Sequence, residues 1–358
     1  MATKINVRSP FYIKASNSSL ASATMELYVY TGQAQSDKPA SPQYTITKNE
    51  LDSNNYVVFE ISELVRDYLE IEYSGTYSFS TQGVWVESDI TMYDGADGTG
   101  SSVGTSNTDL IALDGYGYFT DGINAELKLD ALISNNIIYR ESTEDVILPV
   151  FGQDTNTVKY YQDATLVHTV TVTYNGHSNQ FIQFIDSSVV TGDFNKIIVN
   201  YGSGAGTDRT INIEELQCSK YTPVKATFVN KFGALQDIYL DRKSTESIST
   251  KSETYKSSSL DLSTLTYDVN KHQKQTFDKL GNETIVANTG YIDESFNEII
   301  KQLMLSEQVW LEKLDGTGDA FPVNVTTQSL QYKTSVNDKL VQYTLNFEYA
   351  FDKINNVR

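Results

Sequence analysis

Near its C-terminal end the sequence reads Leu340-Val-Gln-Tyr-Thr-Leu-Asn-Phe-Glu-Tyr-Ala-Phe351. Five apolar side chains in this stretch are separated by single polar residues: Val341, Tyr343, Leu345, Phe347 and Tyr349. Successive side chains of a β-strand point to opposite sides of the sheet, so a period of two places all five on one face. The stretch predicts a long strand with one buried face.

This strand belongs to residues 223–358, whose pattern predicts an α+β domain. Asp293–Glu307 has a helical pattern, with Asp293 as N-cap. Its apolar face carries Phe296, Ile299, Ile300, Leu303 and Met304. Strand patterns lie on both sides of this helix, which indicates one helix packed on an antiparallel sheet. Before this helix, residues 241–259 hold ten Ser or Thr among nineteen residues. This stretch is interpreted as either a mobile loop or a long exposed hairpin.

The first two thirds of the chain predict two tandem β-sandwich domains. Residues 1–125 alternate apolar and polar residues in short runs, interrupted by one short helix at about 61–70 with Ser62 as its N-cap. A Gly/Asp/Ser-rich loop is expected at 94–109. Residues 126–222 contain short strand patterns separated by polar turns, which is typical of an immunoglobulin-like sandwich. The predicted fold class is therefore mainly β, ending in the α+β domain.

The composition is that of a chain with sizeable cores. Hydrophobic residues make up 39% of its 358 residues, and no window approaches the ~20 consecutive apolar residues that a membrane span needs. The first ten residues lack the apolar core of a secretory signal. A single cysteine, Cys218, allows no intramolecular disulfide. We expect a protein that is made in a cytoplasm, without membrane contact.

Acidic residues dominate the charge, and they are unevenly spread. The net charge is −19, which argues against direct nucleic-acid binding because Lys and Arg supply most of the affinity for phosphates. Residues 1–220 hold 12 Lys+Arg and 28 Asp+Glu, a charge of −16, and residues 221–358 hold 15 and 18, a charge of −3. This distribution fits an assembly component with one hydrated and one packed surface, and it fits a need for solubility equally well.

Patterns that indicate catalysis or metal binding are sparse. His168, His177 and His272 match no zinc spacing. Asp94–Gly100 resembles a calcium loop but lacks its distal Glu, since position 105 is Thr. We predict no catalytic residue, no metal site and no cofactor. A glycosidase carboxylate pair among the 46 Asp and Glu is an alternative without support, because the raised pKa of its acid depends on burial.

Tyrosine is abundant, with 24 residues against 2 Trp, and its apolar ring with a polar tip suits interfaces. The first ~20 residues are a candidate arm that a neighbouring subunit completes, with Arg8, Phe11 and Tyr12 as interface candidates. Trp85, Tyr116 and Tyr118 are candidate binding residues, because aromatic rings stack on sugar faces. For Trp85, a buried core position is the stronger interpretation.

Five segments have the word patterns of a known protein family: Lys4–Ile13, Val58–Tyr68, Lys231–Asp237, Gln302–Leu311 and Tyr343–Asp352. They resemble virion structural proteins of tailed phages, particularly those infecting Bacteroidetes-type hosts. The resemblance implies a non-enzymatic, multi-copy ring or collar in the tail, neck or baseplate, whose partners are copies of itself and other virion proteins. It carries over no catalytic residue. The alternative is a carbohydrate-binding adhesin of β-sandwich type, with a glycan as its partner.

Overall fold

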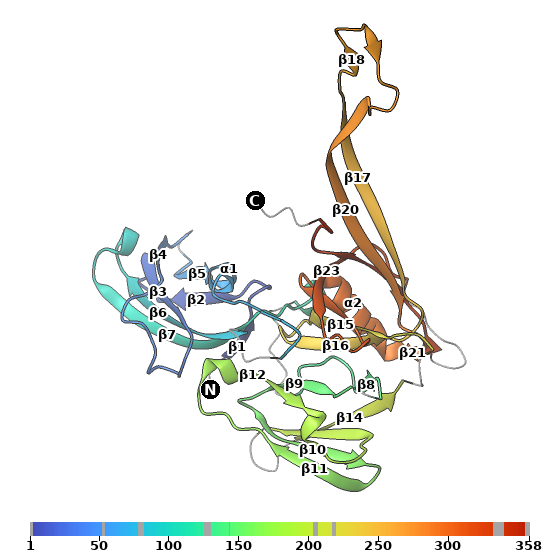
Figure 1. The fold of residues 1–358 in the computed structure, drawn as a ribbon. Helices are drawn as coiled ribbons and strands as arrows, with labels where there is room; N and C mark the ends of the chain where they lie inside the picture. The colour runs from blue at the N-terminus through green and yellow to red at the C-terminus, as the bar shows by residue number, and fades with distance from the viewer. Residues whose placement is uncertain are drawn as a thin grey trace. The chain divides into compact units, whose positions relative to one another are not determined.

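A computed structural model describes residues 3–51, 54–77, 82–122, 124, 130–142, 144–202, 207–216, 220–331 and 340–354. Strands hold 50% of the residues and helices 9% (Figure 1). The predicted mainly β class is therefore confirmed. Cys218 and part of residues 329–334, where the sequence also predicts a strand, lie outside the described residues. Within the described part, no helix is long and apolar enough to cross a membrane.

The chain separates into two compact units. Unit 1 comprises residues 1–218, 227–238 and 298–306, and unit 2 comprises residues 219–226, 239–297 and 307–358. The three domains expected at 1–125, 126–222 and 223–358 stay a prediction.

Unit 1 begins with a five-stranded sheet in the order β1-β7-β6-β3-β4. Its strands are β1 (Thr3–Asn6), β3 (Ser22–Tyr30), β4 (Tyr44–Asn49), β6 (Gly83–Tyr93) and β7 (Ser102–Leu113). A separate pair, β2 (Tyr12–Ser16) and β5 (Tyr56–Glu60), runs antiparallel. Both pieces contribute to one core, in which Phe59 from β5 packs in the same cluster as Met25 and Leu27 from β3. Burial of this apolar surface is the main term that holds the two pieces together.

Three local predictions for this part are wrong. Helix α1 spans Ser62–Arg66, with Ile61 at the N-cap position and no side-chain cap. The Ser62 hydroxyl is buried and instead accepts a hydrogen bond from the Phe11 N–H at 2.7 Å. Much of the expected 94–109 loop belongs to β7, because residues 102–109 pair with β6. The N-terminal segment is no free arm, since Ile5 is fully buried and β1 pairs in parallel with β7.

The second part of unit 1 holds a sheet in the order β11-β10-β13-β14-β8 and a β12-β9 pair. Its strands are β8 (Ile137–Arg140), β9 (Ile147–Phe151), β10 (Thr155–Gln162), β11 (Thr165–Thr171), β12 (Ile182–Asp186), β13 (Lys196–Tyr201) and β14 (Thr207–Glu215). Arg209 from β14 donates to the carbonyls of Ala131, Ile133 and Asn135 at 2.8–2.9 Å. These charge-assisted hydrogen bonds hold residues 131–135 against β14.

A third apolar cluster contains residues from both parts of unit 1 and from the β15–β16 turn. Trp85, Phe151, Phe181 and Phe232 belong to it. Strands β15 (Val224–Val229) and β16 (Leu235–Leu240) are neighbours in a sheet. Gly233 in their turn has φ +77°, and a Cβ there would lie 2.8 Å from the Asp114 backbone. Only glycine satisfies both conditions without strain.

The helix expected at 293–307 is confirmed, as a 3₁₀ turn η5 (Glu294–Phe296) followed by α2 (Asn297–Leu305). The Asp293 side chain accepts a hydrogen bond from the Ser295 N–H, so the cap prediction is also confirmed. Residues 298–306 belong to unit 1, where Gln302 Nε2 donates to Ser134 Oγ at 2.6 Å. The packing of this helix on the sheet of the last third is therefore not confirmed. The other 3₁₀ turns are η1 (Ala96–Gly98), η2 (Phe119–Asp121), η3 (Ser178–Gln180) and η4 (Ser187–Val189).

Unit 2 contains the sheet order β22-β23-β25-β20-β17. Its strands are β17 (Thr245–Lys256), β18 (Leu260–Asp261), β19 (Thr266–Tyr267), β20 (Lys274–Asn288), β21 (Ile292–Asp293), β22 (Val309–Lys313), β23 (Ala320–Val325), β24 (Leu340–Val341) and β25 (Thr344–Tyr349). The strand expected at 340–351 is divided into β24 and β25, because Tyr343 exchanges hydrogen bonds with Thr289 between them. Its predicted buried face is confirmed for Val341, Tyr343, Leu345 and Phe347.

Candidate functional site

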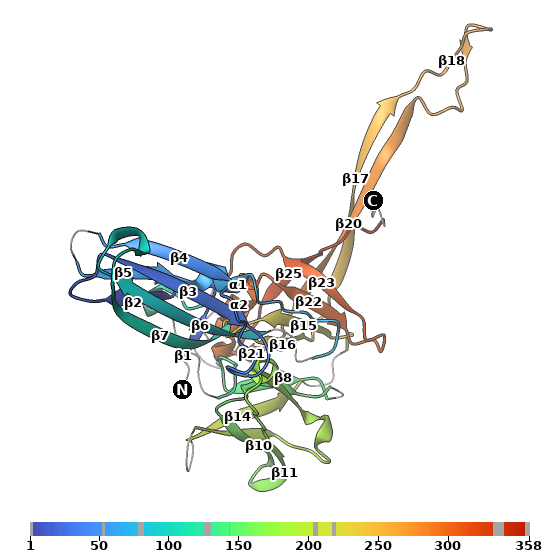
Figure 2. The same cartoon turned by 90° about the vertical axis from the view of Figure 1, so that its left-hand side faces the viewer.

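Residues 245–283 of unit 2 form a two-stranded ribbon, here called the arm (Figure 2). Strand β20 pairs with β25 only over residues 284–288, so among the described residues its part 274–283 pairs with β17 alone. All twelve residues of β17 are exposed. At about 3.4 Å per residue, the part 274–283 extends the ribbon by roughly 30 Å. The open choice between loop and hairpin for 241–259 is thus resolved as a hairpin.

The sequence of the arm explains why it has no buried face. Six of the twelve residues of β17 are Ser or Thr, whose polar side chains pair across the strands, such as Ser247 Oγ with Thr284 Oγ1 at 2.7 Å. The Tyr255 hydroxyl donates to Gln275 Oε1 at 2.6 Å. A bulge at Glu253/Thr254 interrupts the register, which increases the local twist. Isolated two-stranded ribbons are only marginally stable in water.

The tip of the arm (residues 260–269) exposes a group of large apolar side chains. Leu262 is 81% exposed, Leu265 75%, Tyr267 71% and Val269 82%. The short strands β18 and β19 hold this tip, and Asp261 Oδ1 accepts hydrogen bonds from the N–H and hydroxyl of Ser263. Clusters of exposed apolar residues of this kind mark interaction surfaces.

The charge of the arm differs from that of the remaining chain. The arm holds five Lys and six Asp or Glu, which gives −1, so the other 319 residues carry −18 of the total −19. The lysines are Lys251, Lys256, Lys271, Lys274 and Lys279, all exposed. The arm therefore presents an apolar tip on a nearly neutral ribbon.

A second exposed apolar surface lies at the root of the arm. Phe321 from β23 and Phe351 after β25 are 42% and 43% exposed. With Tyr349 from β25 they form a three-ring group, the aromatic patch, whose ring centroids lie 5.5–6.3 Å apart. Such separations are typical of favourable aromatic contacts.

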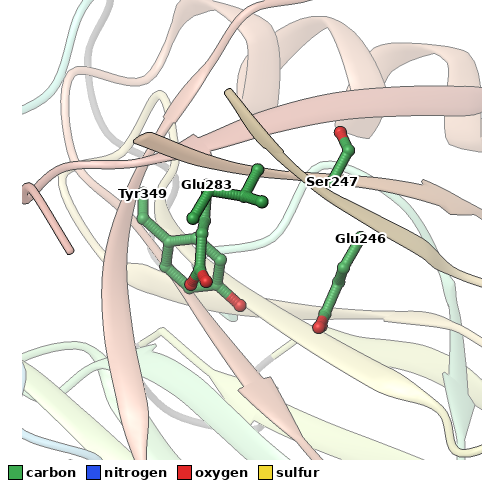
Figure 3. Close-up of a pocket in the computed structure, with 5 residues that line it drawn as sticks. Glu246, Ser247, Glu283 and Tyr349 are labelled. Atoms are coloured by element: carbon green, nitrogen blue, oxygen red, sulfur yellow. The ribbon is translucent and has the colours of Figure 1, made fainter. Parts of the chain in front are cut away.

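A small pocket of about 180 Å³ adjoins this patch, and Figure 3 shows the labelled side chains around it. It is lined by Glu246, Ser247, Ile248, Glu283 and Tyr349. Its carboxylates are already neutralised, because Glu246 pairs with Lys313 and Glu283 with Lys353. Burial raises the pKa of Tyr349, so this phenol stays neutral at ordinary pH. The pocket thus lacks a free charged group that would fix a charged ligand.

Three of the six candidates from the sequence come together in unit 1. The Arg8 guanidinium lies 5.3 Å from the Tyr116 ring centre, and the rings of Tyr116 and Tyr118 contact edge to face at 5.8 Å. Two further members come from α2, which sequence reasoning missed. The Tyr118 hydroxyl donates to Glu298 Oε1 at 2.6 Å, and Lys301 Nζ lies 3.4 Å from the Tyr118 ring centre.

Burial affects the acid–base chemistry of this cluster. It raises the pKa of Tyr116 to about 12, and burial together with the hydrogen bond to Glu298 raises the pKa of Tyr118. Burial opposes ionisation of Glu298, but the bonds from Tyr118 and Gln302 outweigh it and lower the pKa of this carboxyl. Tyr116, Tyr118 and Glu298 are thus held in their ordinary charge states, which is typical of a structural cluster.

The other three candidates are dispersed. Phe11 is half-buried against the first core of unit 1, and Tyr12 is 61% exposed at the start of β2. Trp85 is buried, packs edge to face on Phe181 at 4.8 Å and donates to the Gly32 carbonyl. A pocket of about 200 Å³ lies beside it, lined also by Tyr30, Ala34, Gln35, Glu87, Asp109 and Gln153.

The calcium-like loop uses its carboxylates within the protein. Asp94 Oδ1 accepts from the Ser101 N–H, and Asp97 Oδ1 accepts from the Asn49 amide, both at 2.7 Å. Among the residues that the structure describes, no group of three or more His, Cys, Asp or Glu side chains is placed to hold a metal ion.

Comparison with known proteins identifies no family for this chain. No protein-family model and no curated protein matches the chain. Among solved structures, the calcium-binding domain CBD12 of CALX1.1 is similar at 13% identity, over 56% of this chain and 77% of that chain, with a TM-score of 0.17. CBD12 from CALX1.2 is similar at 12% identity, over 56% and 76%, with a TM-score of 0.18. Likeness at these TM-scores supports no inference about this chain.

Proposed function

We propose that this chain is a non-enzymatic structural component of a tailed phage particle. It acts as a multi-copy ring or collar in the tail, neck or baseplate, with copies of itself and other virion proteins as partners. The observation that carries this proposal is the arm, because a ribbon without a core of its own and with an apolar tip gains stability only when another surface covers it. The resemblance of the segments quoted above supplies the particle type.

We also propose the tandem sandwich organisation of residues 1–222 as the scaffold for this role. Separate apolar clusters in the two parts of unit 1 support it, one built around Met25 and Phe59 and one around Val158 and Ile197.

The test is quantitative mass spectrometry of gradient-purified particles from the source lysate. We expect the chain at a fixed number of copies per particle, and that number would indicate the ring symmetry. Absence of the chain from purified particles would refute the proposal.

A second candidate function is carbohydrate binding, favoured by the pocket beside Trp85. Aromatic rings and a few polar groups around a concave site are the usual features of sugar sites, and Asp109 is an exposed carboxylate at this pocket. A glycan array tests this candidate with the wild-type chain and Asp109→Ala. Binding that Asp109→Ala weakens would support it, and no binding by the wild type would remove it.

A further inference from the structure

We propose that the pocket beside Trp85 in unit 1 binds an amino sugar, a monosaccharide unit that carries a free, protonated amine. This inference rests on the carbohydrate-binding candidate above and names its class of ligand. It does not depend on the assembly role of the arm. The pocket holds about 200 Å³, which is small for a ligand site and limits the occupant to roughly one sugar ring.

The strand register explains why aromatic and acidic side chains meet at this pocket. Trp85 on β6 lies opposite Tyr30 on β3. Glu87, two residues further along β6, lies opposite Asp109 on β7. Side chains at positions i and i+2 of a strand point to the same side of the sheet, so all four lie on one face. The other face of the sheet carries the apolar core around Met25.

Two aromatic rings form the apolar part of the wall. Trp85 and Tyr30 line the pocket and are each 7% exposed. Trp85 Nε1 donates to the Gly32 carbonyl at 3.2 Å, and the Tyr30 hydroxyl accepts from the Gln35 N–H at 3.2 Å. Because their polar atoms are bonded within the protein, these two side chains offer a ligand mainly ring surface. Such rings stack on a sugar and attract a nearby ammonium group.

The charge left over at the pocket is negative. Lys38 Nζ pairs with Glu87 at 2.8 Å and with Asp89 at 3.1 Å, and the Tyr30 hydroxyl also donates to Glu87. Asp109 is exposed and forms no ion pair with any residue that the structure describes. Like charges at opposite positions of neighbouring strands destabilise a sheet, so a cation beside Asp109 would relieve its repulsion with Glu87.

Two amide side chains add hydrogen-bonding groups for the sugar hydroxyls. Gln35 and Gln153 line the pocket. The Gln153 amide oxygen is buried and has no hydrogen-bond partner in the described part of the chain, so this amide has bonding capacity left for a ligand. A wall of rings, free amides and one free carboxylate suits a ligand that carries both hydroxyls and a positive charge.

Other cations suit this pocket less well. Ca²⁺ and Mg²⁺ need several oxygen ligands, and the described residues contain no group of three or more His, Cys, Asp or Glu placed to hold a metal ion. A lysine side chain would leave the free amides of Gln35 and Gln153 without hydroxyl partners. The net charge of −19 favours the approach of a cationic ligand.

The experiment titrates the full chain with glucosamine, galactosamine, N-acetylglucosamine, glucose and Nα-acetyl-lysine amide. The chain holds 2 Trp, so Trp310→Phe leaves Trp85 as the reporter of binding by fluorescence. In this background Asp109→Asn removes the charge of the carboxylate and keeps its size. The control is Asp193→Asn, at an exposed carboxylate of unit 1 that does not line the pocket. If Trp310→Phe unfolds the chain, calorimetry of Asp109→Asn and Asp193→Asn with both tryptophans replaces fluorescence.

We expect at least one of the two amino sugars to bind at least about tenfold more tightly than both neutral sugars, because only the amine adds a charge contact with Asp109 and the rings. Asp109→Asn should remove this difference, and Asp193→Asn should keep it. Raising NaCl to about 0.5 M should weaken the binding of the amino sugar, since salt screens exposed charges.

Equal affinities for amino and neutral sugars would overturn the inference and leave the carbohydrate candidate standing. Amino-sugar binding that Asp109→Asn leaves unchanged would overturn it as well. Tighter binding of the lysine compound would overturn it in favour of a lysine side chain of a partner protein. No binding of any sugar up to about 50 mM would remove both the inference and the carbohydrate candidate. The assembly proposal is unaffected by these outcomes, because particle mass spectrometry tests it separately.

Discussion

Tyr118 connects segments that lie 180 residues apart in the sequence. Its hydroxyl donates to Glu298, its ring contacts Tyr116, and Lys301 lies above that ring. The sequence alone singled out Tyr116 and Tyr118 because aromatic rings stack on sugar faces, and Arg8 as part of a candidate N-terminal arm. It could not identify Glu298 and Lys301 as their partners, because only the tertiary fold brings α2 beside the Gly115–Phe119 segment.

Replacing Tyr118 by Phe tests the importance of this connection. The change removes one hydrogen bond to a carboxylate and leaves the ring contacts in place. We expect the free energy of unfolding to fall by about 1–2 kcal/mol, the range for a partly exposed charge-assisted bond. Urea denaturation measures it, with Tyr12→Phe as the control at a 61% exposed tyrosine. Equal stability of the two variants would show that the bond contributes nothing.

The raised pKa of Tyr116 predicts that the stability of the folded chain depends on pH. Burial raises its pKa to about 12 in the folded chain, against about 10 for an unfolded tyrosine. The folded state therefore holds this proton more tightly, and the stability gained is complete below pH 10 and lost as the pH rises from 10 to 12. In denaturation curves over this range, Tyr116→Phe should lose less stability than the wild type. Parallel pH profiles of the two proteins would contradict the assignment.

Among the secondary-structure elements, those with a regular apolar face could be predicted best from the sequence. The strand at 340–351 and the helix near 293–307 were predicted because each has a buried apolar face. The arm was left open because Thr245–Lys256 has no such face, so its sequence is equally compatible with a loop. The helix at 61–70 was predicted too long, since α1 ends at Arg66. Its predicted cap was also wrong, because the Ser62 hydroxyl accepts from the Phe11 backbone instead.

The tip of the arm should be dispensable for folding. Lys256 and Lys274 pair directly across the ribbon, so an Asn-Gly turn can replace residues 257–273. The removed residues include no buried side chain, and we expect the free energy of unfolding to change by less than about 0.5 kcal/mol. Urea denaturation of the shortened chain measures this. A large loss of stability would mean that the tip packs on its own chain.

At the scale of the whole molecule, the mainly β class could be predicted and the grouping of strands could not. Strand β1 pairs with β7 and β14 with β8, both in parallel and over long separations. Trp85, Phe181 and Phe232 share one apolar cluster although they come from three sequence regions. No local sequence pattern predicts these pairings, because they depend on which apolar faces pack together in the folded chain.

We propose that this chain assembles into a particle through its arm. Amine-reactive labelling of purified particles and of the free chain, measured lysine by lysine by mass spectrometry, tests it most directly. We predict that Lys251, Lys256, Lys271, Lys274 and Lys279 lose reactivity in particles relative to exposed Lys48 on β4. Arm lysines that react equally in the particle and in the free chain would contradict the account.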